Sequence, residues 1–300
     1  MDTRFWGPDG WLMLHSTMYY LPEKPSENEK KKLIKFIKLT PKILPCKYCR
    51  ISMGKYIKSL PIEKYVSTKE RAIEWIYKLH NKVNNKLRRQ GYCIIANPTL
   101  EQVNDQYKKI KTSLEQSGQF IIDKSNDIKQ INKTKKIKKG FRNFDKKAKK
   151  YTTQELILCN NYIGSIIFNF PNIYSNAFHG DLQGLVSLYN QYIGLALYFM
   201  SRVNSKIVEE IKKYIKKNPF QKIFKNTKII NGKIDLDTIM KLYTWYFTLC
   251  KTVNNSLDTN GIDITKFTRK FKKYIVRTCT TYKTVNENTK KFNTCRRKIV

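Results

Sequence analysis

The chain has 300 residues, of which 41% are hydrophobic and 13% aromatic, and its formal net charge is +36. This length suits two ordinary domains that each bury a core. No stretch approaches the roughly 18 uninterrupted apolar residues of a membrane span. The N-terminus lacks a basic region followed by an apolar segment, so we expect no cleaved signal peptide. This charge permits binding to nucleic acid or to acidic partners. It is not diagnostic of either, because Lys, Asn, Ile, Tyr and Phe, which have A/T-rich codons, are all abundant, and a biased genome could produce much of the lysine.

Two of the seven cysteines form a close pair, Cys46 and Cys49. Thiols separated by two residues can close a disulfide across one helical turn, and a helix N-terminus stabilises the thiolate. A zinc half-site would need a second pair of ligands, whereas the other cysteines are scattered singly and the chain has three histidines. The spacing favours a redox pair, with two structural cysteines as the alternative, and we expect no metal site.

The first helix is expected to begin at Gly7-Pro8, because proline is tolerated in a first helical turn. Trp11, His15 and Tyr19 follow at helical spacing, so they share one face. Taken alone, this face is either an ordinary core surface with a hydrogen-bonded histidine or the wall of a binding site.

Further helices follow in the N-terminal part. Pro41 and Pro61 are expected to close the second and third helices, and the fourth continues to about Arg89. The starts are marked by a capping box at Ser26 and Glu29, the pair at Cys46, a second capping box at Ser67 and Glu70, and Asn97-Pro98.

The apolar pattern is lost after this part of the chain and returns later. Residues 124–150 carry twelve Lys or Arg against two Asp, which is typical of a linker or a solvated surface. Beyond them, apolar stretches at 156–170, 182–203, 207–215 and 239–253 predict helices. Asn231-Gly232 predicts a hairpin within 228–235. We therefore expect an all-α protein with a second, mainly helical domain of unknown fold.

Three separated motifs together resemble the Erv/ALR family of FAD-linked sulfhydryl oxidases. They are Trp6-Gly7-Pro8-Asp9-Gly10-Trp11-Leu12-Met13-Leu14-His15, then Cys46-Lys47-Tyr48-Cys49, then Trp75 followed by His80-Asn81-Lys82-Val83-Asn84-Asn85-Lys86-Leu87. The resemblance covers roughly residues 1–112. With its basic, A/T-biased composition, the chain looks most like the versions carried by large cytoplasmic DNA viruses. The resemblance implies a four-helix bundle plus a short fifth helix. In this family the bundle binds FAD, and the protein is usually a homodimer.

The resemblance also implies roles for particular residues. Cys49 would lie against the flavin and Cys46 would exchange with the incoming dithiol. The implied FAD contacts are Gly7, Trp11, His15, Tyr19, His80, Asn81, Val83, Asn84, Lys86, Leu87 and Tyr107.

The chain departs from the family pattern in its other cysteines. Tyr77 occupies the place where many members have a disulfide-bonded cysteine, and Cys93 is left without a role. No second C-x-x-C shuttle pair exists. Cys279 and Cys295 are therefore either a C-terminal shuttle or two free cysteines in a basic tail.

Together these features predict an FAD-linked thiol oxidase. The expected organisation is an oxidase domain at 1–120, a basic linker at 121–150, and a helical domain with a basic tail at 151–300. The expected reaction forms disulfides in a protein dithiol, such as a thioredoxin-like protein, and passes the electrons to O2. The viral resemblance implies a location in the host cytoplasm, at the viral factory, or in the virion. The alternative is a nucleic-acid-binding or scaffold protein whose C-terminal half carries the function.

Overall fold

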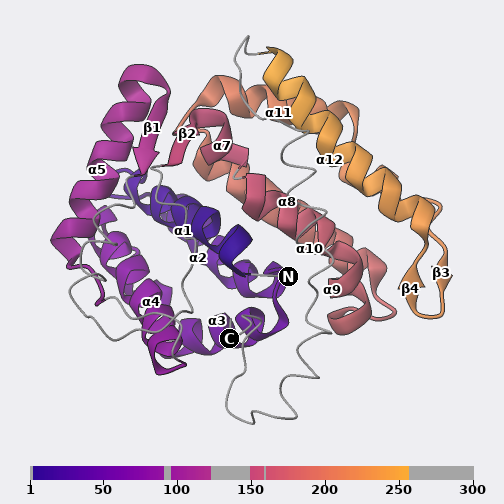
Figure 1. The fold of residues 1–300 in the computed structure, drawn as a ribbon, viewed down its shortest axis with the longest axis horizontal. Helices are drawn as coiled ribbons and strands as arrows, with labels where there is room; N and C mark the ends of the chain where they lie inside the picture. Colours follow the sequence, from indigo (N-terminus) through magenta and orange to yellow (C-terminus); the bar gives the residue numbers. More distant parts are fainter. Residues whose placement is uncertain (1–2, 91–95, 123–148, 159, 257–300) are drawn as a thin grey trace, which may run out of the picture.

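The N-terminal third of the chain folds as a bundle of helices (Figure 1). The computed structural model describes residues 3–90, 96–122, 149–158 and 160–256. The helices of this part are α1 (Thr3–Tyr19), α2 (Glu27–Ile43), α3 (Lys47–Ser59), the 3-10 helix η1 (Ile62–Tyr65), α4 (Lys69–Arg89) and α5 (Leu100–Ser117). α1 packs against α4 and α5, and α2 packs against α3. The predicted four-helix bundle with a fifth helix is confirmed, although α5 has 18 residues and is not short.

Some helix boundaries differ from the sequence-based expectations. α1 begins at Thr3 and contains Pro8, because the missing N–H of proline removes only one bond near the helix start. α2 likewise continues through Pro41 for two more residues. The capping box at Ser26 is confirmed. The second one is wrong, because Thr68 is the N-cap of α4 and accepts a hydrogen bond from the Arg71 N–H.

The rest of the described chain is also mainly helical. Its helices are α7 (Thr153–Leu158), α8 (Asn160–Phe168), α9 (Phe170–Ala177), α10 (Leu182–Met200), α11 (Ser205–Lys217), η2 (Phe220–Phe224) and α12 (Leu236–Ser256). The predicted hairpin is confirmed as β3 (Ile229–Ile230) and β4 (Lys233–Ile234), where Asn231 and Gly232 both have positive φ.

One short strand pair was not anticipated. β1 (Gln119–Ile122) pairs antiparallel with β2 (Lys149–Thr152), so these two stretches lie side by side. The linker expected at 121–150 falls mostly outside the described residues. No helix in the described parts of the chain is long and apolar enough to cross a membrane.

The C-terminal helices pack directly on the N-terminal bundle. α8 lies against α1, and α10 lies against α2 (Figure 1). The α1–α8 approach requires a glycine, since a Cβ at Gly10 would meet the Tyr162 ring at 2.9 Å. On α2, the Phe36 ring stacks on Tyr192 with centroids 4.9 Å apart. One continuous hydrophobic core therefore runs through both halves, and the division at 1–120, 121–150 and 151–300 stays a prediction.

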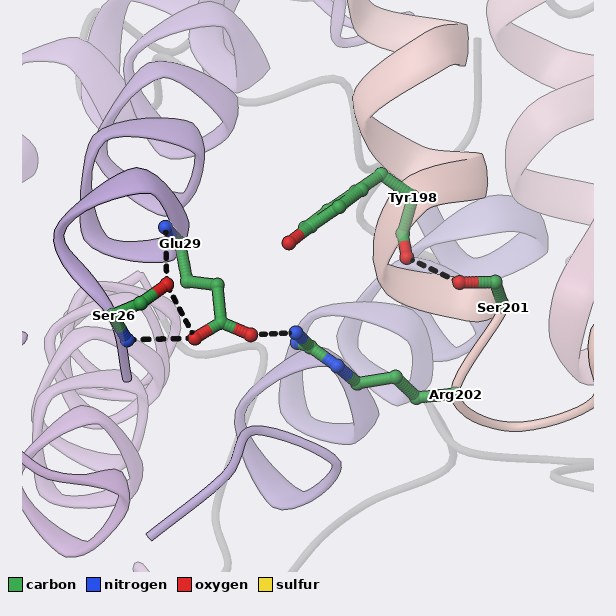
Figure 2. A network of polar contacts seen from close by, with 5 residues as sticks. All are labelled: Ser26, Glu29, Tyr198, Ser201 and Arg202. Carbon is green, nitrogen blue, oxygen red and sulfur yellow. Dashed lines mark hydrogen bonds and ion pairs between the residues drawn. The ribbon is translucent and has the colours of Figure 1, made fainter. Parts of the chain in front are cut away.

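An ion pair joins α2 to the end of α10 (Figure 2). Glu29 accepts a hydrogen bond from the Ser26 N–H at 2.7 Å, and its second oxygen pairs with the Arg202 guanidinium. That guanidinium also lies over the Tyr198 ring, 5.4 Å from its centroid. Burial works to raise the pKa of Glu29, but the bonds from Ser26 and the charge of Arg202 outweigh it and hold this pKa below its usual value.

Arg202→Met is expected to loosen the contact between the two halves. Losing a charge-assisted bond costs about 1–3 kcal/mol of unfolding free energy, measurable by thermal or urea unfolding. Because the native pKa of Glu29 is lowered, the pair stabilises the fold at neutral pH. Its contribution is present above the unfolded-state pKa of the carboxyl and fades as the pH falls through the lowered native pKa.

Lys213→Met is the matched control, because Lys213 pairs with Glu210 on one helix and its side chain is 71% exposed. Exposed pairs contribute little to stability, because water and salt screen their charges. Equal losses of stability in the two variants would show that the Glu29–Arg202 pair contributes no more to the free energy of unfolding than an exposed pair does.

Candidate functional site

The cysteine pair lies at the N-terminus of α3, as the sequence predicts. Cys46 is the N-cap, and its sulfur accepts a hydrogen bond from the backbone N–H of Cys49, with N and Sγ 3.4 Å apart. Both residues are thiols in the structure. Cys46 has 0% of its surface exposed, whereas Cys49 is half-buried. As whole residues, Cys46 is therefore enclosed and Cys49 is partly exposed.

The two thiols also differ in acidity. The pKa of Cys46 is lowered to about 6, chiefly because the Cys49 thiol donates a hydrogen bond to its sulfur, with burial opposing and backbone N–H groups helping. The pKa of Cys49 is raised well above its usual value, because donating that bond and being buried both favour its protonated form. The two opposite shifts favour Cys46 over Cys49 as the site of the thiolate in the reduced pair.

Two cationic side chains flank the pair. Arg50 Nη1 donates to the Leu44 carbonyl at 2.7 Å. Lys86, on α4, donates to Ser52 Oγ at 2.6 Å, one turn beyond Cys49 on α3. The Lys86 charge acts to lower the pKa of Cys49 without reversing its rise. Lys86 thus connects α4, one of the predicted binding helices, to the helix of the cysteine pair.

Aromatic and imidazole rings from three helices form one cluster. Trp11 of α1 stacks on His80 of α4, with centroids 3.9 Å apart and planes 12° from parallel. His15 stacks on Tyr107 of α5 at 4.8 Å, and Tyr107 stacks on Tyr19 at 4.9 Å. These five residues were predicted from separate motifs, and the structure brings all of them together. We call them the ring cluster.

Both histidines of the ring cluster are neutral at physiological pH. Burial, followed by the proximity of His80, lowers the pKa of His15 well below its usual value. Burial lowers the pKa of His80 to about 4. His15 Nε2 and His80 Nδ1 share a hydrogen bond of 3.1 Å. His15 Nδ1 is buried and has no hydrogen-bond partner among the described residues, so one polar atom of the cluster is unsatisfied.

The other predicted contacts lie on α4 and α1, two of the helices that carry the ring cluster. Asn81, Val83, Asn84 and Leu87 are half-buried along α4, the helix that carries His80. Gly7 lies in α1, where an added Cβ would meet nothing within 4 Å, so close packing within the described chain does not explain this glycine.

Sequence reasoning missed three polar partners of the site. Asn104 accepts a hydrogen bond from the Tyr19 hydroxyl, Ser52 binds Lys86, and Asn169 donates to the Pro45 carbonyl. A helical pattern marks Asn104 as lying on the α5 face near Val103 and Tyr107. No local pattern relates Asn169 to Pro45, because they are 124 positions apart.

Of the remaining cysteines, one lies within the described residues. Cys250 is fully enclosed in the core, and burial raises the pKa of its thiol to about 12, so it is a poor nucleophile. Cys93, Cys159, Cys279 and Cys295 lie outside the described residues, and the shuttle stays a prediction. Within the described parts of the chain, no group of three or more His, Cys, Asp or Glu side chains is placed to hold a metal ion.

The fold and site define a helical domain with a thiol pair at one helix N-terminus, linked by Lys86 to a helix of the ring cluster. Residues 8–108 match the Erv1 / Alr family.

Curated relatives match the same region. The mitochondrial FAD-linked sulfhydryl oxidase ERV1 of Saccharomyces cerevisiae is 32% identical over 91 residues, which are 30% of this chain and 47% of the relative. The FAD-linked sulfhydryl oxidase ERV2 of the same yeast is 31% identical over 86 residues, 29% of this chain and 43% of the relative. A protein of Invertebrate iridescent virus 3, provisionally named an FAD-linked sulfhydryl oxidase, is 27% identical over 89 residues, 30% of this chain and 60% of the relative.

These matches cover about a third of the chain or less. The chain spans about half the length of the curated relatives it matches. No solved structure gives a significant match.

Proposed function

We propose that this chain is an FAD-dependent thiol oxidase that forms disulfide bonds in proteins. Electrons would pass from a dithiol substrate through Cys46 and Cys49 to FAD and then to O2, giving H2O2. The observation that carries the proposal is the unequal thiol pair at the N-terminus of α3, joined through Ser52 and Lys86 to the helix that carries His80. The names of the similar proteins support the same activity.

The residues present fit the cofactor. The ring cluster offers flat aromatic faces. His15 Nδ1 is a buried polar atom without a hydrogen-bond partner among the described residues, and a cofactor ring with polar atoms would supply one. Lys86 adds a positive charge for a phosphate or a reduced flavin. When bound, the flavin supplies the chemistry of taking two electrons from a dithiol and delivering them to oxygen. The residues that would hold it are Gly7, Trp11, His15, Tyr19, His80, Asn81, Val83, Asn84, Lys86, Leu87 and Tyr107.

The cysteines divide the thiol chemistry between them. With the pair oxidised, a substrate thiolate attacks Cys46 Sγ, forms a mixed disulfide and releases Cys49 as a thiolate. A second substrate thiol resolves the mixed disulfide and gives its proton to Cys49. The substrate leaves with one disulfide, and the pair gains two electrons and one proton, as a Cys46 thiolate beside a Cys49 thiol. Cys49 must then lose its proton before it can act as a nucleophile. The Cys46 thiolate already accepts a hydrogen bond from the Cys49 S–H and is placed to take that proton.

The partners and location follow from the same proposal. A thioredoxin-like protein dithiol is the proposed substrate class, and Cys279 and Cys295 are the proposed shuttle. A homodimer of this chain would use a surface away from the contacts of α1 and α2 with α8 and α10. The host cytoplasm, at a viral factory, or the virion is the proposed location.

The test is a visible spectrum and an oxygen-consumption assay on the purified full chain. A flavin spectrum and oxygen uptake with dithiothreitol are expected. A colourless protein that consumes no oxygen would overturn the proposal. If that protein bound DNA with a strongly salt-dependent affinity, the net charge of +36 would instead favour the nucleic-acid-binding alternative.

A further inference from the structure

The segment that precedes the redox pair is held from two sides. Arg50 donates to the Leu44 carbonyl from within α3. The next carbonyl, that of Pro45, accepts a hydrogen bond of 2.8 Å from Asn169 Nδ2. Asn169 lies between α8 and α9, so the C-terminal half supplies this second contact.

The Asn169 side chain is fixed in the orientation that this contact needs. Only 4% of Asn169 is exposed. Its Oδ1 accepts a hydrogen bond of 3.1 Å from Asn172 Nδ2, which turns the amide nitrogen toward Pro45. Both polar atoms of the Asn169 amide are therefore hydrogen-bonded in a buried setting. Breaking the bond to Pro45 would cost free energy, because the buried Pro45 carbonyl would lose this donor.

The same contact lies next to the inaccessible sulfur. Leu44, Pro45 and Cys46 are all buried, whereas Cys49 is half-buried. The proposed reaction needs a substrate sulfur to approach Cys46 Sγ, and no part of Cys46 is exposed in the structure. Some covering element must therefore move during the reaction.

We propose that Asn169 is a positioning residue that holds the α8–α9 junction over Cys46, so that an incoming thiol reaches this sulfur only after the Asn169–Pro45 hydrogen bond opens. This inference rests on the proposed thiol oxidase function. It makes the C-terminal half a determinant of substrate choice. A dithiol that binds the junction and draws it away from Pro45 reacts faster with Cys46 than one that does not.

The experiment measures alkylation of each thiol in the reduced full chain by iodoacetamide, followed by trypsin and mass spectrometry. Cleavage after Lys47 places Cys46 and Cys49 on different peptides. Asn169→Leu removes the hydrogen-bond donor while keeping a similar side-chain volume. It is expected to raise the rate of alkylation at Cys46 about tenfold, because the loss of one buried hydrogen bond shifts the opening equilibrium by about that factor. The rate at Cys49 should stay within about twofold, and the midpoint of the Cys46 pH profile should remain near 6.

Two further variants separate positioning from general loosening. Asn169→Gln retains an amide donor and should restore slow alkylation of Cys46. Asn176→Ala, at an exposed position on α9, should leave it unchanged. Cys250 reports on the fold, since alkylation of this enclosed thiol requires the core to open.

Wild-type Cys46 that already reacts rapidly, or an Asn169→Leu rate within twofold of wild type, would overturn the inference. If Asn169→Leu exposes Cys250 as well, the deciding variant is Asn172→Ala, which removes only the bond that orients Asn169 and should speed alkylation of Cys46 alone. An unchanged Cys46 rate in that variant would also overturn the inference. Alkylation requires neither flavin nor turnover, so an inactive, colourless protein would contradict the oxidase proposal and leave this result readable.

Discussion

Cys49→Ser is expected to abolish oxygen consumption with dithiothreitol while leaving FAD bound. A serine hydroxyl cannot form a disulfide with Cys46 and stays protonated at neutral pH, so the route for electrons is broken. The loss should reach at least about a thousandfold, the scale seen when a covalent nucleophile is removed. The ring cluster belongs to α1, α4 and α5, so the flavin spectrum should persist.

The matched control is Cys250→Ser. It makes the same change at a buried thiol that lies in α12, outside the pair and the ring cluster. Turnover should remain, with some loss of thermal stability from burying a hydroxyl. Turnover that survives in Cys49→Ser would remove Cys49 from the proposed electron path.

Trp11→Ala is expected to release most of the bound FAD. Trp11 stacks on His80 at 3.9 Å, and a flavin or adenine ring that joins this stack would use the same aromatic surface. Stacking between a base and an aromatic side chain contributes about 1–3 kcal/mol, which corresponds to roughly 5- to 150-fold weaker binding when it is lost. The ratio of flavin to protein after extensive dialysis measures the effect.

Trp11→Phe separates ring stacking from the loss of bulk. Phenylalanine keeps an aromatic face and should retain much more FAD than alanine does. Thermal unfolding of both flavin-free variants shows whether the bundle itself is weakened. Full retention of FAD by Trp11→Ala would move the cofactor away from the ring cluster.

The local helical signals were largely readable in the sequence. Helical spacing predicted that Trp11, His15 and Tyr19 share a face, because side chains three and four positions apart are neighbours on any α-helix. The cap at Ser26 and the start of α3 at Cys46 also depend on only a few adjacent residues. The errors at Pro41 and Thr68 are shifts of a few residues at helix ends, where tertiary packing and alternative caps compete.

The assembly of the site was less accessible to such reasoning. Family resemblance, not periodicity, grouped His80 and Tyr107 with the α1 residues, and the stacking geometry that joins them is visible only in the structure. The pairing of Lys86 with Ser52 depends on how α4 crosses α3, which no pattern within either helix specifies.

Local sequence was enough to place Cys46 and Cys49 at the start of a helix, with an aromatic and histidine face before them and a helix bearing His80 after them. Three further features are visible only in the packed structure: Cys46 is enclosed, its neighbour Pro45 accepts a hydrogen bond from Asn169, and α8 and α10 lie against the bundle. Separation along the chain accounts for this division. Helix spacing and caps act within a few residues, whereas the hydrogen bond from Asn169 to Pro45 joins residues that are 124 positions apart.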